Sequence, residues 1–338
     1  MGDVSSAEQT VHGVQADRPS EIPKPGWIQI VKRALKEATK DAVPLLAAGV
    51  AFYAFLAMVP TLIALVMIYG LVTDDEAAVA EQVESFGSVL PTEAEQLLTG
   101  QMESLVRTSD RALGIGLIVA LLLALWSASS GINNLIKALN VAYDKEVTRS
   151  FVKSRLLALG LTIGAISFMV LAVALVAALP VVLDALDMPG WVKALVQGGR
   201  WLGLVVAVLV ALAVLYRLGP DRDAPKFRWV SLGAVVATVL WVLGSLGFSI
   251  YVDNFGSYGK TYGTLAGVVI LLLWLWLSSY AALLGAEVNA EMEQQTIKDT
   301  TKGEPKPLGQ RNAVKADSIP DDEETADERD RPDNTRNC

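Results

Sequence analysis

The stretch VPLLAAGVAFYAFLAMVPTLIALVMIYGLV, which occupies residues 43–72, contains no charged side chain. An α-helix needs about 20 consecutive apolar residues to cross the hydrocarbon layer of a membrane. This stretch is therefore long enough to span one. Further apolar stretches have the same character, and the candidate spans are residues 43–72, 112–132, 156–183, 201–216, 229–252 and 265–286.

The spans are continuous apolar runs without the alternation that is typical of barrel strands. They predict an all-α integral membrane protein with six transmembrane helices. The fourth span is the shortest and needs Trp201 and Tyr216 at its ends to reach across. Pairs of glycines four residues apart predict close helix–helix packing, and they are Gly160/Gly164, Gly199/Gly203 and Gly263/Gly267.

The composition agrees with a membrane protein. Of the 338 residues, 52% are hydrophobic and 19% are charged. One cysteine, Cys338, and one histidine, His12, exclude a disulfide framework and a metal site built from several such residues. The net charge of −8 argues against nucleic acid as a partner. No phosphate-binding GxxxxGK[ST] loop is present, and we expect no metal or organic cofactor.

The basic residues predict the orientation. Fifteen Lys and Arg lie before the first span, between the second and third, and between the fourth and fifth, against five on the opposite side. The richer side is cytoplasmic in multi-pass proteins. We therefore expect a plasma-membrane protein with both termini in the cytoplasm.

The parts outside the spans have three distinct patterns. Residues 27–42 predict an amphipathic helix, which lies at the membrane interface, packs as a lid on the bundle, or does both. Residues 73–111 predict two short external helices, either as an acidic solvated cap, which we favour, or as a gate or cation site. Residues 1–26 and the acidic residues 297–338 predict a disordered cytoplasmic arm and tail, which leaves residues 27–296 as the membrane domain.

Polar residues near the spans are the candidate functional residues. Those at the end of the second span either bond neighbouring helices or line a polar cavity, and they are Ser127, Ser129, Ser130, Asn133, Asn134 and Asn140. Pro60 predicts a break in the first span, two turns after Tyr53. Tyr258, Lys260 and Tyr262 form an outer loop in which the lysine meets a lipid phosphate or is solvated.

The last span ends at Glu287 and Asn289, which we place at the cytoplasmic boundary. An ion pair with a basic loop residue is the expected arrangement for Glu287. No nucleophile and base can be paired in the sequence, and no acidic cluster is expected near the basic loops. The residues therefore indicate no enzyme chemistry and no catalytic residue.

Three segments resemble the YihY/BrkB family of bacterial inner-membrane proteins. They are AAGVAFYAFLAMVPTL (47–62), NNLIKALNVAYD (133–144) and YGTLAGVVILLLWLWLSSYAALLGAEVNAE (262–291), in the family's order. The resemblance covers residues 27–293 and implies a six-helix fold in the bacterial inner membrane. It implies no settled activity: members have been labelled ribonuclease BN, connected with virulence, and linked to lipid movement.

The sequence argues against the ribonuclease label, because nucleases of that kind hold metals with clustered His and Asp. Our leading hypothesis is a transporter or flippase-like protein for a lipid or an amphiphilic envelope molecule. The alternative is a non-transporting membrane scaffold that organises envelope proteins through its tails and its basic loops. Membrane lipids are the expected partners, one lipid-like molecule is the possible substrate, and no oligomeric state is indicated.

Overall fold

The structure is a computed structural model, and it describes residues 13–72, 110–173, 189–254 and 264–319, with isolated positions between 175 and 183. The regular secondary structure of these parts is helical apart from one isolated β-bridge between Pro225 and Thr301, and loops connect the helices. The elements are η1 (Pro19–Glu21), α2 (Lys24–Lys40), α3 (Val43–Val72), α6 (Asp110–Ala142), α7 (Phe151–Val173), α9 (Gly190–Leu218), α10 (Phe227–Asn254), α12 (Thr264–Gln294) and α13 (Val314–Asp317).

Four of the described helices are long and apolar enough to cross a membrane, in α7, α9, α10 and α12. A fifth span results if α2 and the first part of α3, which meet at an angle of 64°, form one bent segment. The all-α membrane protein is therefore confirmed, whereas the described part of the chain does not establish six spans. The predicted external helices fall in residues 73–109, outside the described residues.

The prediction that the fourth span is the shortest is wrong, because α9 begins at Gly190 and contains 29 residues. Lys193 and Arg200 interrupt the apolar run in the sequence but lie inside the helix. Backbone hydrogen bonding within a helix does not depend on apolar side chains. For the same reason α6 and α12 continue past the predicted ends of their spans, to Ala142 and Gln294.

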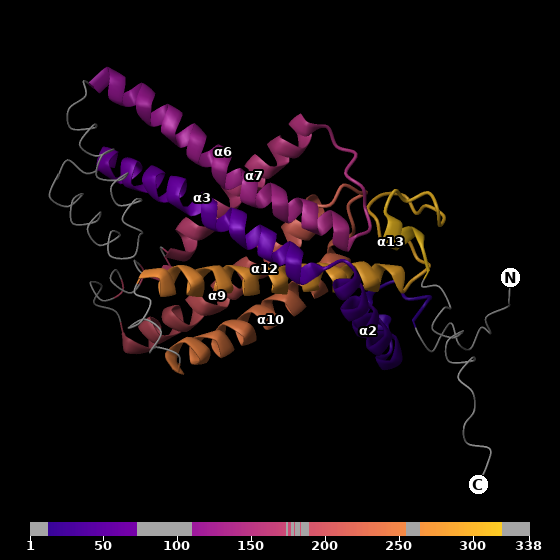
Figure 1. Cartoon of the computed structure of the whole chain (residues 1–338). Helices are drawn as coiled ribbons and strands as arrows, with labels where there is room; N and C mark the ends of the chain where they lie inside the picture. Colours follow the sequence, from indigo (N-terminus) through magenta and orange to yellow (C-terminus); the bar gives the residue numbers. More distant parts are fainter. Residues whose placement is uncertain are drawn as a thin grey trace, which may run out of the picture.

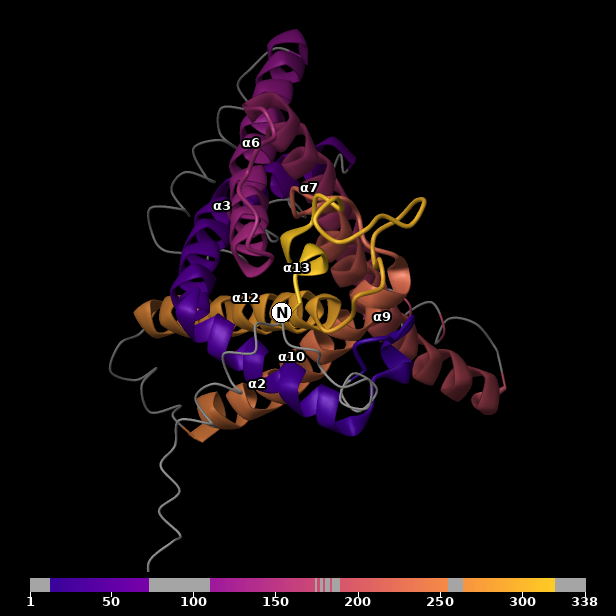
Figure 2. The same cartoon turned by 90° about the vertical axis from the view of Figure 1, so that its right-hand side faces the viewer.

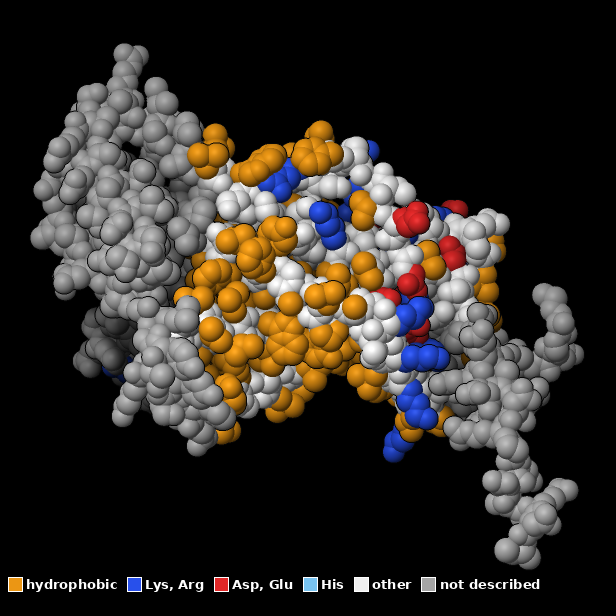
Figure 3. All heavy atoms as spheres, in the orientation of Figure 1, with side chains coloured by type: hydrophobic (Ala, Val, Ile, Leu, Met, Phe, Trp, Pro, Cys, Tyr) orange, Lys and Arg blue, Asp and Glu red, His pale blue; other side chains and the backbone are white. Residues whose placement is uncertain are grey.

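The helices pack in two groups that α12 connects. One group runs from α3 to α6 to α7, and the other from α9 to α10 to α12, while α12 also packs against α3 (Figures 1 and 2). The buried core lies at one end, where α3, α7 and α10 begin and α6, α9 and α12 end. We call this region, together with α2 and residues 295–319, the charged end. In Figure 3 acidic side chains gather there, while hydrophobic side chains cover much of the rest of the visible described face.

Helix α2 packs on the charged end through one face. Ile30 and Ala34 are buried against Trp229 of α10 and against Val288 and Met292 of α12. A second apolar face points away from the protein, and its exposed members are Ile28, Val31 and Leu35. The structure therefore shows the expected lid, and the outer face remains available for the expected position at a membrane interface.

The prediction of disordered tails is wrong for residues 13–26 and 297–319. Ala16 and Ile22 are buried, and so are Arg311 and Lys315. The two tails bind each other, since the Ile297 N–H donates to the Val14 carbonyl over 2.9 Å. The acidic composition that predicts disorder belongs mainly to residues 320–338, which lie outside the described residues.

The close helix contact uses glycines other than the predicted pairs. A Cβ atom at Gly285 of α12 would lie 2.6 Å from the Tyr216 hydroxyl and 2.7 Å from the Ala237 Cβ. A Cβ atom at Gly233 of α10 would clash with the Gly285 carbonyl. In contrast, a Cβ atom would meet no atom within 4 Å at Gly160, Gly164, Gly199, Gly203 or Gly267. The prediction that these glycines pack closely is therefore wrong within the described chain, and Gly263 lies outside it.

Candidate functional site

The polar residues at the end of the second predicted span lie on α6, and several bond their own helix. Ser129 and Ser130 donate from Oγ to the Trp126 carbonyl over 2.8 and 3.2 Å. Asn134 donates to the Ser130 carbonyl over 2.8 Å. These bonds satisfy the side chains locally, so they do not account for bonding between helices.

Arg155 of α7 joins this group from the neighbouring helix. Its Nη2 donates to the Trp126 carbonyl over 2.7 Å, and both Nη atoms lie 3.4 Å from the Ser130 Oγ. The guanidinium also lies 3.7 Å from the centre of the Trp126 ring, which is a cation–π contact. Its Nε is buried and has no hydrogen-bond partner among the described residues. A cation with a spare donor therefore lies beside a serine hydroxyl.

Asn133 lies on the same face of α6 as Trp126 and Ser130, because residues three and seven positions apart share a helix face. It is half-buried and makes no hydrogen bond to the described residues, and the same holds for Ser127. We call Ser127, Ser130, Asn133, Asn134 and Arg155 the α6–α7 polar group.

Asn140, which the sequence grouped with these residues, belongs to the charged end. Its Nδ2 donates to the Ile136 carbonyl, and its Oδ1 accepts the N–H of Asp221 over 2.7 Å. Asp221 in turn binds the start of the α7 segment, since its Oδ2 accepts hydrogen bonds from Thr148 and Arg149. Burial alone raises the pKa of Asp221, but these bonds outweigh it, and the pKa lies below its ordinary value.

The other predicted sites are only partly within the described chain. Tyr53 is an exposed residue of α3 whose ring contacts Phe52. Helix α3 is assigned as one helix from Val43 to Val72, and the kink expected at Pro60 stays a prediction. A sharp bend lies between α2 and α3. Membrane helices tolerate proline where neighbouring groups satisfy the freed carbonyl. Tyr258, Lys260 and Tyr262 fall outside the described residues.

Asn289 clamps α12 onto α10. Its Oδ1 accepts the Gly233 N–H over 2.8 Å, and its Nδ2 donates to the Val230 carbonyl over 3.2 Å. Both bonds occur where the glycines bring the two helices together. Tyr216 of α9 also binds α12, because its hydroxyl donates to the Ala282 carbonyl over 2.7 Å. Asn289 therefore has a structural role that its sequence position at a predicted boundary did not reveal.

Glu287 does not form the ion pair that we expected. The side chain is fully buried, and neither carboxylate oxygen has a hydrogen-bond partner among the described residues. The next acids on α12 take the available cations instead. Glu291 pairs with Arg33 of α2 and with Lys315 of α13, both at 2.7 Å, and Glu293 binds Arg222 through two bonds of 2.7 and 2.8 Å.

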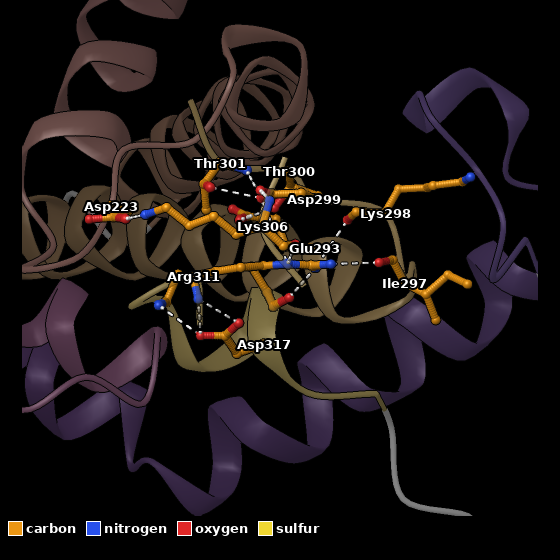
Figure 4. Close-up of polar contacts among 12 residues, drawn as sticks. Asp223, Glu293, Ile297, Lys298, Asp299, Thr300, Thr301, Lys306, Arg311 and Asp317 are labelled. Carbon is orange, nitrogen blue, oxygen red and sulfur yellow. Dashed lines mark hydrogen bonds and ion pairs between the residues drawn. The ribbon is translucent and has the colours of Figure 1, made fainter. Parts of the chain in front are cut away.

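The segment after α12 is held by Arg311, as Figure 4 shows. The Arg311 guanidinium donates to the backbone carbonyls of Ile297, Lys298, Lys306 and Ala316 over 2.6–3.2 Å. Its backbone N–H donates to Asp317. A buried arginine with four carbonyl acceptors fixes the surrounding loop in one conformation.

Sequence reasoning missed Arg222, Glu293, Arg311 and Lys315. The acids at 287, 291 and 293 did carry a signal, since residues 287 and 291 share a face of any helix that continues past residue 286. Their basic partners come from α2, from the α9–α10 connection and from the tail. Because those partners are far away in sequence, no local pattern could identify them.

Three further acids come together where α2 ends and α6 ends. One carboxylate oxygen from each of Glu37, Asp41 and Asp144 lies within 4.8 Å of the others. Glu37 pairs with Lys40 at 2.9 Å, and Asp144 pairs with Lys315 at 3.0 Å. Burial, followed by the charges of Asp144 and Glu37, raises the pKa of Asp41. An acidic cluster near the basic loops therefore exists, contrary to the sequence prediction.

Comparison with known proteins places the chain among bacterial membrane proteins. The protein family described as Virulence factor BrkB matches residues 34–309. The ribonuclease-like protein YfkH of Bacillus subtilis (strain 168) is 32% identical over 259 residues, which cover 73% of this chain and 89% of that protein. The UPF0761 membrane protein VP0125 of Vibrio parahaemolyticus is 30% identical over 279 residues, covering 80% of this chain and 84% of the relative. No solved structure matches the chain.

Proposed function

The chain belongs to the Virulence factor BrkB family of membrane proteins, and we propose that it is a flippase-like transporter for a lipid or an amphiphilic envelope molecule in the bacterial inner membrane. In this proposal it is not an enzyme. The charged end faces the cytoplasm, because the loops at that end carry most of the Lys and Arg outside the tails.

The observation that carries the proposal is the closure of the bundle at one end. Buried core residues gather at the charged end of α3, α6, α9, α10 and α12. In α9 Tyr216, near the end of the helix, is fully buried, whereas several large side chains earlier in the helix, including Val205 and Val210, are exposed. Only 6% of the candidate membrane window of α9 and 11% of that of α7 are buried inside the described protein.

Helices that pack together at one end, and that leave most of the membrane windows of α7 and α9 unburied among the described residues, suit one state of an alternating-access carrier. A non-transporting membrane scaffold does not require this difference between the charged end and the membrane windows. The sealed end would prevent leakage, while a substrate with acyl chains would enter between helices whose apolar side chains are not buried against one another. Exposed apolar side chains would then contact the chains of the lipid.

The α6–α7 polar group supports a substrate with a charged headgroup. Arg155 offers a cation and an unused buried Nε donor beside Ser130. Asn133 adds an amide that is free among the described residues. Arginine and hydroxyl donors suit a phosphate group, so we place the headgroup contact at these residues.

The experiment is lipid translocation by the purified protein in proteoliposomes with fluorescent phospholipids, read out by dithionite quenching of the outer leaflet. We expect faster translocation than in protein-free vesicles. Asn133→Leu should slow it several-fold, whereas Asn133→Gln, which retains the amide, should remain near the wild-type rate.

Two results would contradict the proposal. Translocation no faster than in protein-free vesicles, across a panel of phospholipids and glycolipids, would remove the transport function. Cleavage of RNA by the same preparation, abolished by a single substitution in the protein, would remove the non-enzymatic part. Equal rates for Asn133→Leu and the wild type would move the headgroup contact elsewhere.

A further inference from the structure

We propose that α2 is a docking surface for anionic phospholipids, which its free lysines bind by their phosphate groups in the leaflet at the charged end. The proposed transport pathway does not use this helix, so the inference stands independently of the transport function. The occupant of the surface is the membrane itself, in which a layer of negative headgroups covers the hydrocarbon.

The packing of α2 places it at the level of the headgroups. Its buried face contacts Trp229, in the first turn of α10, and Val288 and Met292, in the last two turns of α12. Both of these helices are candidate membrane spans, and the contacted residues lie at their ends. A helix that packs beside the ends of two spans lies at the boundary of the membrane rather than at its centre.

The bend between α2 and α3 has the direction that a surface helix requires. Helix α3 contains 30 residues without a charge, so it is long enough to cross the membrane without α2. Spanning helices are tilted from the bilayer normal by about 20° on average. Helix α2 departs from the first part of α3 by 64°, and in Figure 1 it runs across the direction of the long helices.

The outer face of α2 provides the apolar part of an interfacial helix. Ile28, Val31 and Leu35 are 58%, 47% and 56% exposed, and their spacing of three and four residues places them on one side of the helix. We call these three residues the apolar strip. About half of each side chain is not covered by the described protein, and lipid chains would cover the remainder.

The free charges beside the apolar strip are all positive. The only acid of α2, Glu37, pairs with Lys40. The exposed charged residues of α2 that have no ion-pair partner among the described residues are Lys24, Lys32 and Lys36.

These three lysines are placed to reach lipid phosphates. Lys24 and Lys32 lie four residues before and after Ile28, so they flank the apolar strip, and Lys36 follows one turn later. A lysine in this position lays its alkyl stem on apolar surface and holds its ammonium at the phosphate level. Because each such lysine is attracted by negative headgroups, the surface favours anionic over zwitterionic phospholipids.

Docking of α2 on lipid also reaches the charged end through Arg33. On the side of α2 that faces the bundle, the Arg33 guanidinium donates to Glu291 over 2.7 Å and to Gln295 over 2.6 Å. One helix thus holds lipid phosphate through Lys32 and α12 through the next residue. The proposed surface therefore couples the lipid composition of the leaflet to the seating of α2 on the bundle.

The test measures which lipid lies beside α2 when the full chain is in phosphatidylcholine proteoliposomes. The variant Leu35→Cys, made in a Cys338→Ser background, carries a nitrobenzoxadiazole fluorophore. Phosphatidylglycerol or phosphatidylcholine with a nitroxide on its acyl chain is added at the same mole fraction. We expect both lipids to quench the fluorophore, and the phosphatidylglycerol to quench it more strongly by a factor of about two or more.

Removing the lysine charges should remove this preference. Lys32→Gln together with Lys36→Gln should bring the ratio of the two quenching constants close to one, and about 1 M salt should do the same for the chain with all its lysines, because salt screens the attraction. Lys298→Gln together with Lys302→Gln is the matched control. It removes two exposed lysines of the tail and should leave the ratio unchanged.

Circular dichroism and gel filtration establish that each variant is folded, and if Leu35→Cys does not fold, Ile28→Cys carries the fluorophore on the same strip. Quenching by aqueous iodide but by neither lipid would overturn the proposal. So would protection from both iodide and lipid, since another protein surface would then cover the strip. Equal quenching by the two lipids in the chain with all its lysines would overturn it as well. Because the readout is lipid contact, failure of the translocation assay leaves this result unaffected.

Discussion

Arg222 and Glu293 form the most completely buried ion pair among the described residues, and replacing the arginine tests how the charged end is stabilised. The two side chains are 1% and 0% exposed, and the Arg222 guanidinium makes bonds of 2.8 and 2.7 Å to the two oxygens of Glu293. It also lies 4.1 Å from the centre of the Tyr143 ring. Arg222→Met retains much of the side-chain volume and removes the charge and both bonds.

The magnitude follows from what the substitution leaves behind. Removing one partner of a buried ion pair costs about 3–5 kcal/mol, because the remaining charge is buried without its partner. Glu293 would keep one hydrogen bond, from the Thr300 hydroxyl over 2.9 Å, which retains about 1–2 kcal/mol. We therefore expect Arg222→Met to lower the free energy of unfolding by about 3 kcal/mol.

A second substitution separates two losses of stability: that from the buried Glu293 charge without its partner, and that from altered packing. The double variant Arg222→Met with Glu293→Met contains no buried charge at this position, and it should recover most of the lost stability, since apolar replacements of whole buried pairs are often neutral. Arg228→Met is the matched control: Arg228 is an exposed arginine of α10, so its replacement should change stability by less than about 0.5 kcal/mol.

The assay is equilibrium unfolding by sodium dodecyl sulfate in mixed micelles, followed by circular dichroism, because heating often unfolds membrane proteins irreversibly. Two outcomes would refute the reasoning. One is a loss below about 1 kcal/mol for Arg222→Met, which is the cost of an ordinary substitution. The other is a double variant no more stable than the single variant.

Three further predictions concern packing, pH and backbone conformation. Gly285→Ala should lower the free energy of unfolding in the detergent titration by about 2 kcal/mol, because the new Cβ would overlap the Tyr216 hydroxyl. Gly160→Ala is the control: its Cβ would lie in open space, so the free energy of unfolding should rise by about 0.5–1 kcal/mol. The Lys306 hydrogen bond lowers the pKa of Asp223. The ionised Asp223 therefore stabilises the folded state fully above the ordinary pKa of about 3.9, and this stabilisation is lost as the pH falls through the lower pKa of the folded state. Hydrogen exchange in residues 297–319, corrected for intrinsic rates, should therefore increase at pH 3 relative to pH 6, and Asp223→Asn should reduce this change. Ala42→Gly should stabilise the protein by about 0.5–1 kcal/mol, since the φ of 51° favours glycine, and an unchanged or lower midpoint in the detergent titration would contradict this.

The helical membrane body could be predicted because long uncharged runs are a local property of the sequence. The ends of the helices could not, since α9 includes Lys193 and Arg200, and α6 continues through Asn133 and Asn140. Hydropathy reports the preference of side chains for lipid, whereas a helix ends where its backbone bonding ends.

The site was predictable only in part. The position of Asn133 near one membrane end follows from the sequence, but the approach of Arg155 depends on how α6 packs against α7. Asn289 was identified as a boundary residue, yet its clamp on Gly233 requires the α10–α12 crossing. The GxxxG spacing marked other glycines, because spacing alone does not indicate which face of a helix meets a neighbour.

The ordered tail also changes how the scaffold alternative should be tested. Removing residues 297–338 would delete Arg311 and Lys315, and the loss would damage the charged end itself. Truncation after residue 319 leaves the described contacts intact. A phenotype lost on that shorter truncation would favour a scaffold acting through the tail, and an intact phenotype would favour the membrane body.

The position of the tail contacts has a consequence for biosynthesis. Residues 296–302 bind Val14, Ala16 and the Ala224–Lys226 backbone, all of which leave the ribosome earlier. Those partners are therefore synthesised before the segment that joins the two tails. A nascent chain stopped before Arg311 would possess its described membrane helices and an incomplete charged end, with Glu291 lacking Lys315. The described contacts of the charged end can therefore be completed only after residues 311–315 have been made.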